Sequence, residues 1–293
     1  MSHTNSIKKI LSHKFIDEVK LRKYIKKLMI PLGPEVWTVF LKGGHSDEYT
    51  ALVEMSFNHN NSYTPSEDIL IFIKNNNLPF FHQLEINKKI FHQIQIDIKR
   101  LNPRHVKIGN QDISKSYQNI LLLISHRRYN LGYVQGMADF LVPFLQSCPE
   151  YQAYFLYLDL IKKIEFNIIN LQGNLILRFR ETMENIDPVL CTYLSEIGLE
   201  FHVFSFRWFN CLFFREFKYE EYLKIFTFIL AHKNINNILI YIAVGILSIL
   251  KSDIIRQGYN DNVLMIQDLN NRKGVKVEKI LEKAKRLYKC KKL

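Results

Sequence analysis

Apolar residues recur at helical spacing along most of this chain. Isoleucines stand every four residues from Ile86 to Ile98, which places them on one face of an amphipathic helix, and Pro103 predicts that this helix ends near Asn102. Similar patterns predict further helices at 112–127, 136–147, 150–168, 171–196, 204–216, 219–231, 235–251 and 275–289, with a short one near 261–264. No stretch alternates apolar and polar residues for long enough to indicate a sheet, so we predict an all-α protein.

The beginning of the chain combines helical spacing with basic charge. Residues 7–30 alternate apolar and basic side chains, and we interpret them as a packing helix or a lead-in, with an amphipathic basic helix lying on a membrane as the alternative. Pro34 predicts the start of a short helix whose Trp37 faces inward. The polar residues 43–64 predict a loop, after which Thr64 caps another helix.

The longest apolar run is Ile238–Leu250, which stops at Lys251. At this length it is too short to span a bilayer, and it predicts a buried core helix, with a buried strand as the alternative. The chain of 293 residues is 47% hydrophobic, which is enough to build a large globular core. Its four cysteines form no C-x-x-C pair and no apolar leader follows the start, so we expect a reducing, cytoplasmic location.

The formal net charge of +12 changes the expected partners more than the expected fold. Basic patches attract nucleic acids, anionic membranes and acidic protein surfaces, although solvated lysine faces are the commoner reason for such a charge. Basic residues cluster at 8–9, 20–27 and 283–292. Because neither an aromatic RNA-binding strand nor a helix-turn-helix signature accompanies them, we expect no nucleic acid as a partner.

Several enzyme signatures are missing. The sequence has no G-x-x-x-x-G-K-[ST], so the protein is not itself a P-loop GTPase or ATPase, and it has no G-x-G-x-x-G, G-x-S-x-G or H-E-x-x-H. No pair of histidines has the spacing of metal ligands, and His82 and His92 are interpreted as surface or helix residues. We therefore predict no metal site.

Two short segments carry the remaining chemistry. The first, IQIDIKRLNP (94–103), contains an I-x-x-D-x-x-R pattern made by Ile94, Asp97 and Arg100. Asp97 and Arg100 are predicted to fall off the isoleucine stripe, three residues apart, where they can meet. The second, GYVQGM (132–137), sets one glutamine beside a glycine just before an apolar run, which indicates a backbone that bends or approaches something closely. Its residues are Gly132, Tyr133, Gln135, Gly136 and Met137.

Together these two segments resemble the paired motifs of the TBC domain, the catalytic module of Rab GTPase-activating proteins. The segments GPEVWTVFL and FSFRWFNCLFFREF are similar to further parts of that family, so the resemblance covers about 31–290. It implies an all-α fold of two helical subdomains, about 31–165 with both motifs and about 166–290, after a basic lead-in at 1–30. Trp208 is then expected in the core, and Arg207 and Arg215 beside Glu216 are expected to form structural ion pairs.

The resemblance also implies a function in vesicle trafficking. The chain would act as a catalytic activator, accelerating GTP hydrolysis by a Rab-type small GTPase in its GTP form, with Arg100 as arginine finger and Gln135 as glutamine finger supplied in trans. It would bind no cofactor of its own, because GTP and Mg²⁺ are carried by the partner. The supporting or partner-binding residues would be Asp97, Gly132, Tyr133, Gly136 and Met137.

Two positions depart from the family pattern. Leu101 stands where the family commonly has a threonine, and Gly33 stands where it commonly has an arginine. The loss of a hydroxyl beside Arg100 favours an alternative function, a catalytically weak Rab-binding or scaffold module of the same fold. A nucleic-acid binder, suggested only by the charge, is the third hypothesis. We expect a cytoplasmic location and, as a further expectation, peripheral contact with endomembranes.

Overall fold

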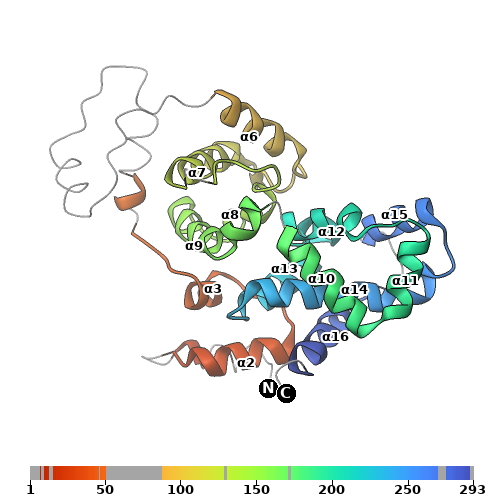
Figure 1. The fold of residues 1–293 in the computed structure, drawn as a ribbon. Coiled ribbons are helices and arrows are strands. Elements are labelled where there is room, and N and C mark those ends of the chain that lie inside the picture. Colours follow the sequence, from red (N-terminus) through yellow and green to blue (C-terminus); the bar gives the residue numbers. More distant parts are fainter. Residues whose placement is uncertain are drawn as a thin grey trace. The chain divides into compact units, whose positions relative to one another are not determined.

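The computed structural model describes residues 7, 10–12, 16–45, 47–50, 88–128, 131–170, 173–269 and 275–290. Nearly all regular structure in these ranges is helical (Figure 1), as the sequence predicted. The predicted helix beginning at Thr64 lies outside the described residues, and so does Ile86. The chain divides into two units, which we call the central unit, Leu41–Lys162, and the flanking unit, Met1–Phe40 with Lys163–Leu293.

The central unit contains both sequence motifs. Its helices pack through apolar faces, and the tyrosine, serine and asparagine side chains around Glu150, at the start of α9, add polar links: Ser116 and Asn119 of α7 both donate to its carboxylate. The elements are α6 (Lys88–Arg100), β1 (Lys107–Ile108), β2 (Gln111–Asp112), α7 (Ser114–Arg127), η1 (Asp139–Leu141), α8 (Val142–Leu145) and α9 (Glu150–Ile169), whose last turns lie beyond the division at Lys162.

The flanking unit is built from both ends of the chain. Its elements are α2 (Glu18–Leu28), α3 (Pro34–Phe40), α10 (Gly173–Ile186), α11 (Pro188–Glu196), α12 (Phe201–Asn210), η2 (Phe214–Glu216), α13 (Tyr219–Leu230), α14 (Ile235–Ile254), α15 (Tyr259–Gln267) and α16 (Val277–Cys290). The aromatic segment 201–217 lies in its core, where Trp208 is fully buried among Phe179, Phe204 and Phe213. This agrees with the prediction for Trp208.

The division differs from the expected one at the N-terminal end. Residues 31–40 were expected to join the first subdomain and residues 1–30 to form a separate lead-in, but both belong to the flanking unit. The reason is packing between residues that lie far apart in the sequence. Trp37 of α3 meets the ring of Phe226 edge-on at 5.4 Å, and the Arg22 guanidinium lies 4.1 Å above the ring of Phe40 while donating to the carbonyl of Leu230. Aromatic side chains bury a large area, and these contacts attach α2 and α3 to α13.

The short helix α3 begins at Pro34, as predicted, and buries Trp37 completely. Gly33 precedes it, and the Gly33 carbonyl accepts the first helical N–H groups, from Val36 and Trp37. A Cβ at Gly33 would meet only the flexible carboxylate end of Glu35. Gly33 therefore has a local capping role here.

Helix α14 forms the centre of the flanking unit. It contains the apolar run Ile238–Leu250, which is buried as a core helix, as predicted. The helix has 20 residues, so it is longer than the apolar run that was predicted to be too short to cross a membrane. Among the described helices only α14 is long and apolar enough to cross a membrane, and 67% of its apolar window is buried. A Cβ at Gly245 would lie 2.9 Å from the carbonyl oxygen of Ile280, so this glycine lets α16 pack closely against α14.

Two predicted helices are divided in the structure. The pattern at 171–196 forms α10 and α11, because Pro188 starts a new helix that is capped by Asp187, whose carboxylate accepts from the Leu190 N–H at 3.1 Å. The segment 204–216 forms α12 and η2 with a left-handed turn at Phe213. In both segments helical periodicity continues across the break, which Pro188 marks in the first and the left-handed residues Leu212 and Phe213 mark in the second.

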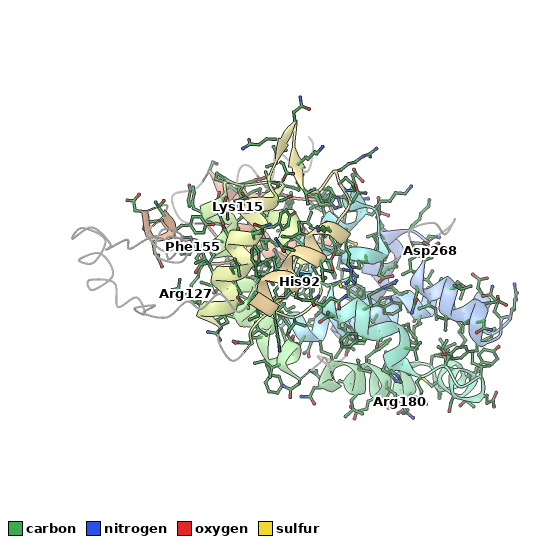
Figure 2. All side chains as sticks on the ribbon, turned by 90° about the horizontal axis from the view of Figure 1, so that it is seen from above. His92, Lys115, Arg127, Phe155, Arg180 and Asp268 are labelled. Carbon is green, nitrogen blue, oxygen red and sulfur yellow. The ribbon has the colours of Figure 1, made fainter. Side chains whose placement is uncertain are left out.

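The hairpin β1–β2 was not predicted. It consists of two residues in each strand, paired antiparallel, and all four are exposed. Figure 2 shows it projecting from its unit, with side chains pointing to solvent. Strands this short have no alternating pattern from which a sheet could be recognised.

Candidate functional site: two motifs on one buried carboxylate

The first motif occupies the last two turns of α6. Ile94 and Ile98 are buried, as the stripe predicted, and Arg100 is the last helical residue, with half of its side chain exposed. Asp97 is only 1% exposed, so the prediction that it falls off the buried stripe was wrong. A residue three positions after Ile94 shares its helical face, and the carboxylate therefore points into the unit.

Asp97 binds both motifs. Its Oδ2 accepts hydrogen bonds from the Tyr133 hydroxyl and from the Gly136 N–H, each at 2.8 Å. Its Oδ1 lies 3.5 Å from a guanidinium nitrogen of Arg100, as predicted for residues three apart on a helix. A buried carboxylate is stable only when such donors surround it. The same side chain thus contacts the arginine at the end of α6 and two residues, Tyr133 and Gly136, of the loop that contains Gln135.

Left-handed backbone shapes the second motif. Gly132 and Gly136 have φ angles of +60° and +98°, which side-chain-bearing residues rarely adopt. Between them the chain turns so that Gln135 is exposed while Gly136 and Met137 are buried. Burial, reinforced by the charge of Asp97, raises the pKa of Tyr133 well above its usual value, so its hydroxyl stays protonated and remains a donor. Tyr133 is partly buried, and its hydroxyl links the second motif to Asp97.

Met137 anchors the end of this loop. It is 1% exposed, its sulfur accepts from the Val134 N–H, and its carbonyl accepts from the hydroxyl of Tyr157 in α9 at 2.8 Å. Tyr157 was missed by the sequence analysis, although a tyrosine inside an apolar helical pattern signals a buried hydroxyl that needs a partner. The ring of Tyr157 also stacks on Phe140 at 5.4 Å, which fixes η1 below the loop.

The chain after Arg100 is also held in place. Leu101 is 6% exposed, so the position where the family commonly has a hydroxyl is here an apolar contact with the interior. Further on, the carbonyl of His105 accepts from the Tyr117 hydroxyl at 3.0 Å and from the Gln146 amide at 2.7 Å. Gln146 directly follows α8, so the segment after the first motif is tied to the end of the helix that comes after the second. The contacts of Asp97 with Arg100, Tyr133 and Gly136 bring the two motifs to the same region of the central unit.

Arg100 and Gln135 are therefore two exposed polar side chains on a rigid, hydrogen-bonded frame. A guanidinium provides a permanent positive charge with donors in a plane, and an amide provides both a donor and an acceptor. Such a pair can neutralise charge on phosphoryl oxygens and orient a water molecule, and neither task needs a group that titrates near pH 7. That either residue performs these tasks remains a prediction.

The other candidate residues have structural surroundings. His92 is exposed on α6 (Figure 2), as expected. Arg207 donates twice to Glu216, both at 2.8 Å, in the structural ion pair that was predicted. Burial raises the pKa of Glu216 and Arg207 opposes that rise, so the carboxylate depends on its arginine. Within the described ranges no group of histidine, cysteine or acidic side chains could hold a metal ion.

Comparison with known proteins decides the family. The model of the Rab-GTPase-TBC domain matches residues 34–255, which is most of the chain and includes both motifs. The chain belongs to the Rab-GTPase-TBC domain family. The resemblance noted from the two motifs is thus confirmed, and so is the all-α fold.

Relatives and solved structures agree with this assignment. The chain is 24% identical over 253 residues to the GTPase-activating protein gyp1 of Schizosaccharomyces pombe, covering 76% of this chain and 45% of that protein. It is 27% identical over 180 residues to human TBC1 domain family member 17, covering 58% and 27%. The crystal structure of the Ypt/Rab-GAP domain of Gyp1p superposes with a TM-score of 0.77 at 20% identity, covering 98% of this chain and all of that one. The chain spans less than half the length of these curated relatives.

Proposed function

We propose that this chain accelerates GTP hydrolysis by a Rab-type small GTPase, with Arg100 as arginine finger and Gln135 as glutamine finger. The observation that carries the proposal is the contact of Asp97 with both motifs: it meets the side chain of Arg100 on its own helix and accepts from Tyr133 and Gly136 on either side of Gln135. Membership of the family supports the partner class, and the names of the relatives as GTPase-activating proteins support the activity.

The chemistry follows from what phosphoryl transfer requires. The attacking water must be in line with the bond that breaks, and charge accumulates on the transferred phosphoryl oxygens. Arg100 would bridge these oxygens, and Gln135 would accept from the water and donate to the phosphate through the two ends of its amide. The GTP-bound partner would supply nucleotide and Mg²⁺, and this chain would supply no cofactor. We place this activity in the cytoplasm, at the surface of a membrane that carries the GTPase.

The test is single-turnover phosphate release from a panel of GTP-loaded Rab proteins. Arg100→Ala should lower the stimulated rate by about 10³-fold or more, because an arginine supplied in trans contributes about 10³–10⁵. Lys99→Ala is the matched control, since it removes one exposed positive charge from the adjacent position of the same helix. Equal rates for the two variants would refute the role of Arg100.

Gln135 is tested by two substitutions. Gln135→Ala should lower the rate by about 10²-fold, as the loss of one positioned donor does elsewhere. Gln135→Glu keeps an acceptor for the water and removes the donor to the phosphate, so it should also be slow. Undiminished turnover in Gln135→Glu would exclude the dual role of the amide.

The second candidate is a scaffold with the same fold. Leu101 favours it, because the hydroxyl common in the family is replaced by a buried apolar side chain. The same assay separates the two functions. A chain that binds GTP-loaded Rab proteins but accelerates GTP hydrolysis by no member of the panel would be a scaffold. Restoration of turnover by Leu101→Thr would attribute the weak catalysis to this position.

A further inference from the structure

The flanking unit carries a basic surface made by helices from opposite ends of the sequence. Both α2 and α16 pack on α13 (Figure 1): Arg22 of α2 donates to the carbonyl of Leu230, and Glu278 of α16 pairs with Lys224 at 2.6 Å. Both helices thus pack on the same helix, and the charge of Lys27 in α2 adds to burial and Lys289 in lowering the pKa of Lys285 in α16. Positive charges from α2 and α16 therefore lie within electrostatic reach.

The outer face of α2 is basic and partly apolar. Lys20, Lys23 and Lys27 are exposed and lie three and four residues apart, so they share one helical face, opposite the buried Leu21. Val19 begins this face with 70% of its side chain exposed. Among the described residues these three ammonium groups have no ion-pair partner, and no acidic residue stands between Lys20 and Lys27 in the sequence.

The acidic residues of α2 are used elsewhere. Glu18 pairs with Arg22 at 2.7 Å, and Asp17 caps the helix by accepting from the Lys20 backbone N–H at 2.9 Å. Arg22 in turn is occupied by Leu230 and the ring of Phe40. The guanidinium and the carboxylates thus serve the fold, while the side chains of the three lysines form no hydrogen bond or ion pair within the described part of the chain.

Helix α16 adds charge along the same edge. Its buried side, with Ile280 and Leu281, lies against the unit, which leaves Lys289 exposed and Lys285 half-buried beside Lys27. Glu282 offsets part of this charge at Lys285. We define the basic face as Val19, Lys20, Lys23, Lys27, Lys285 and Lys289.

The composition of this face selects among anionic partners. None of the six residues is an arginine, which makes bidentate contacts with phosphates, or an aromatic residue, which stacks on bases; of the residues beside them, Tyr24 is only partly exposed and Arg286 is exposed. Lysines act as point charges without required geometry, and an exposed valine among them gains free energy only where an apolar phase is available. Anionic lipid headgroups above acyl chains meet both conditions.

We propose that the basic face binds the surface of an anionic lipid bilayer, with Val19 entering the interfacial region. This goes beyond the proposed function and does not depend on it, because none of the six residues belongs to the central unit. The attraction is electrostatic, so it should weaken as salt shortens the Debye length from about 10 Å at 0.1 M to about 3 Å at 1 M.

The first test is sedimentation of the full chain with vesicles. We expect binding to phosphatidylcholine vesicles that contain about 30 mol% phosphatidylserine, and loss of binding on pure phosphatidylcholine. Replacing Lys20, Lys23 and Lys27 together by Gln should weaken binding by roughly 100-fold, at roughly fivefold for each lysine. The matched control replaces Arg104, Lys107 and Arg256, which are exposed basic residues outside the face, and it should bind like the wild type.

The second test uses the intrinsic fluorescence of the chain. Trp37 and Trp208 are fully buried, so Val19→Trp introduces the one exposed indole of the protein. Its emission should shift to shorter wavelength on the anionic vesicles and should be quenched by brominated lipids. Equal weakening by the control triple variant, or an unshifted Val19→Trp spectrum on vesicles that bind the chain, would overturn the proposal. Preferential binding of an RNA oligonucleotide by the same face would overturn it as well.

Discussion

The central prediction concerns Asp97, which is buried and yet should control the site. Replacing Asp97 by Asn preserves its shape and removes its charge. The Oδ2 of this carboxylate accepts hydrogen bonds from Tyr133 and Gly136, and its Oδ1 contacts the guanidinium of Arg100. An asparagine has a single acceptor oxygen, so whichever way its amide turns, its NH₂ group faces a donor.

The magnitude follows from the three contacts. If the amide oxygen faces Tyr133 and Gly136, two hydrogen bonds to a charged acceptor become neutral, at a cost of about 1 kcal/mol each. The contact with Arg100 contributes less than about 1 kcal/mol, because half of that side chain is exposed and the distance is 3.5 Å. We therefore expect Asp97→Asn to lower the free energy of unfolding by about 2–3 kcal/mol. Asp97→Ala leaves the buried Gly136 N–H without an acceptor and should cost about 3–5 kcal/mol.

The assay is urea unfolding followed by circular dichroism, combined with a double-mutant cycle. Tyr133→Phe removes the hydroxyl, and its coupling energy with Asp97→Asn should be about 1–2 kcal/mol, because the two groups share one hydrogen bond. Stimulated GTP hydrolysis should fall in Asp97→Asn while Arg100 and Gln135 are intact. A stability within about 0.5 kcal/mol of wild type, or no coupling with Tyr133→Phe, would refute this role of the carboxylate.

Three further predictions concern the frame around the site and the flanking unit. Gly132→Ala should lower the free energy of unfolding by about 1–2 kcal/mol through left-handed strain alone, because no atom lies within 4 Å of the added Cβ; an unchanged urea midpoint would contradict this. Arg207→Met should cost about 3–5 kcal/mol by removing the guanidinium that pairs with the buried Glu216, and Glu216→Gln should be milder, both checked by thermal unfolding. At pH 8 the exposed Cys290 should react fastest with Ellman's reagent, because burial raises the pKa of the Cys148 thiol to about 12 and so depletes its thiolate; a fast phase that persists in Cys290→Ser would disprove it.

The sequence by itself determined the helices and the family. Amphipathic spacing located α6 with its buried Ile94 and Ile98, Pro34 marked the start of α3, and the order of the two motifs pointed to the TBC family. These features are readable because helix periodicity, proline geometry and short motifs depend on residues within a few positions of one another.

Only the tertiary structure decided where Asp97 points and which parts of the chain pack together. Its hydrogen-bond donors lie 36 and 39 residues away, so helical spacing could bring Asp97 near the buried isoleucines but could not show which groups satisfy its charge. The packing of α3 on α13, and the approach of Lys27 to Lys285 that underlies the basic face, likewise join segments far apart in the sequence. Such contacts depend on the shapes and charges of surfaces that meet after the helices have formed, and helical spacing in the sequence does not predict them.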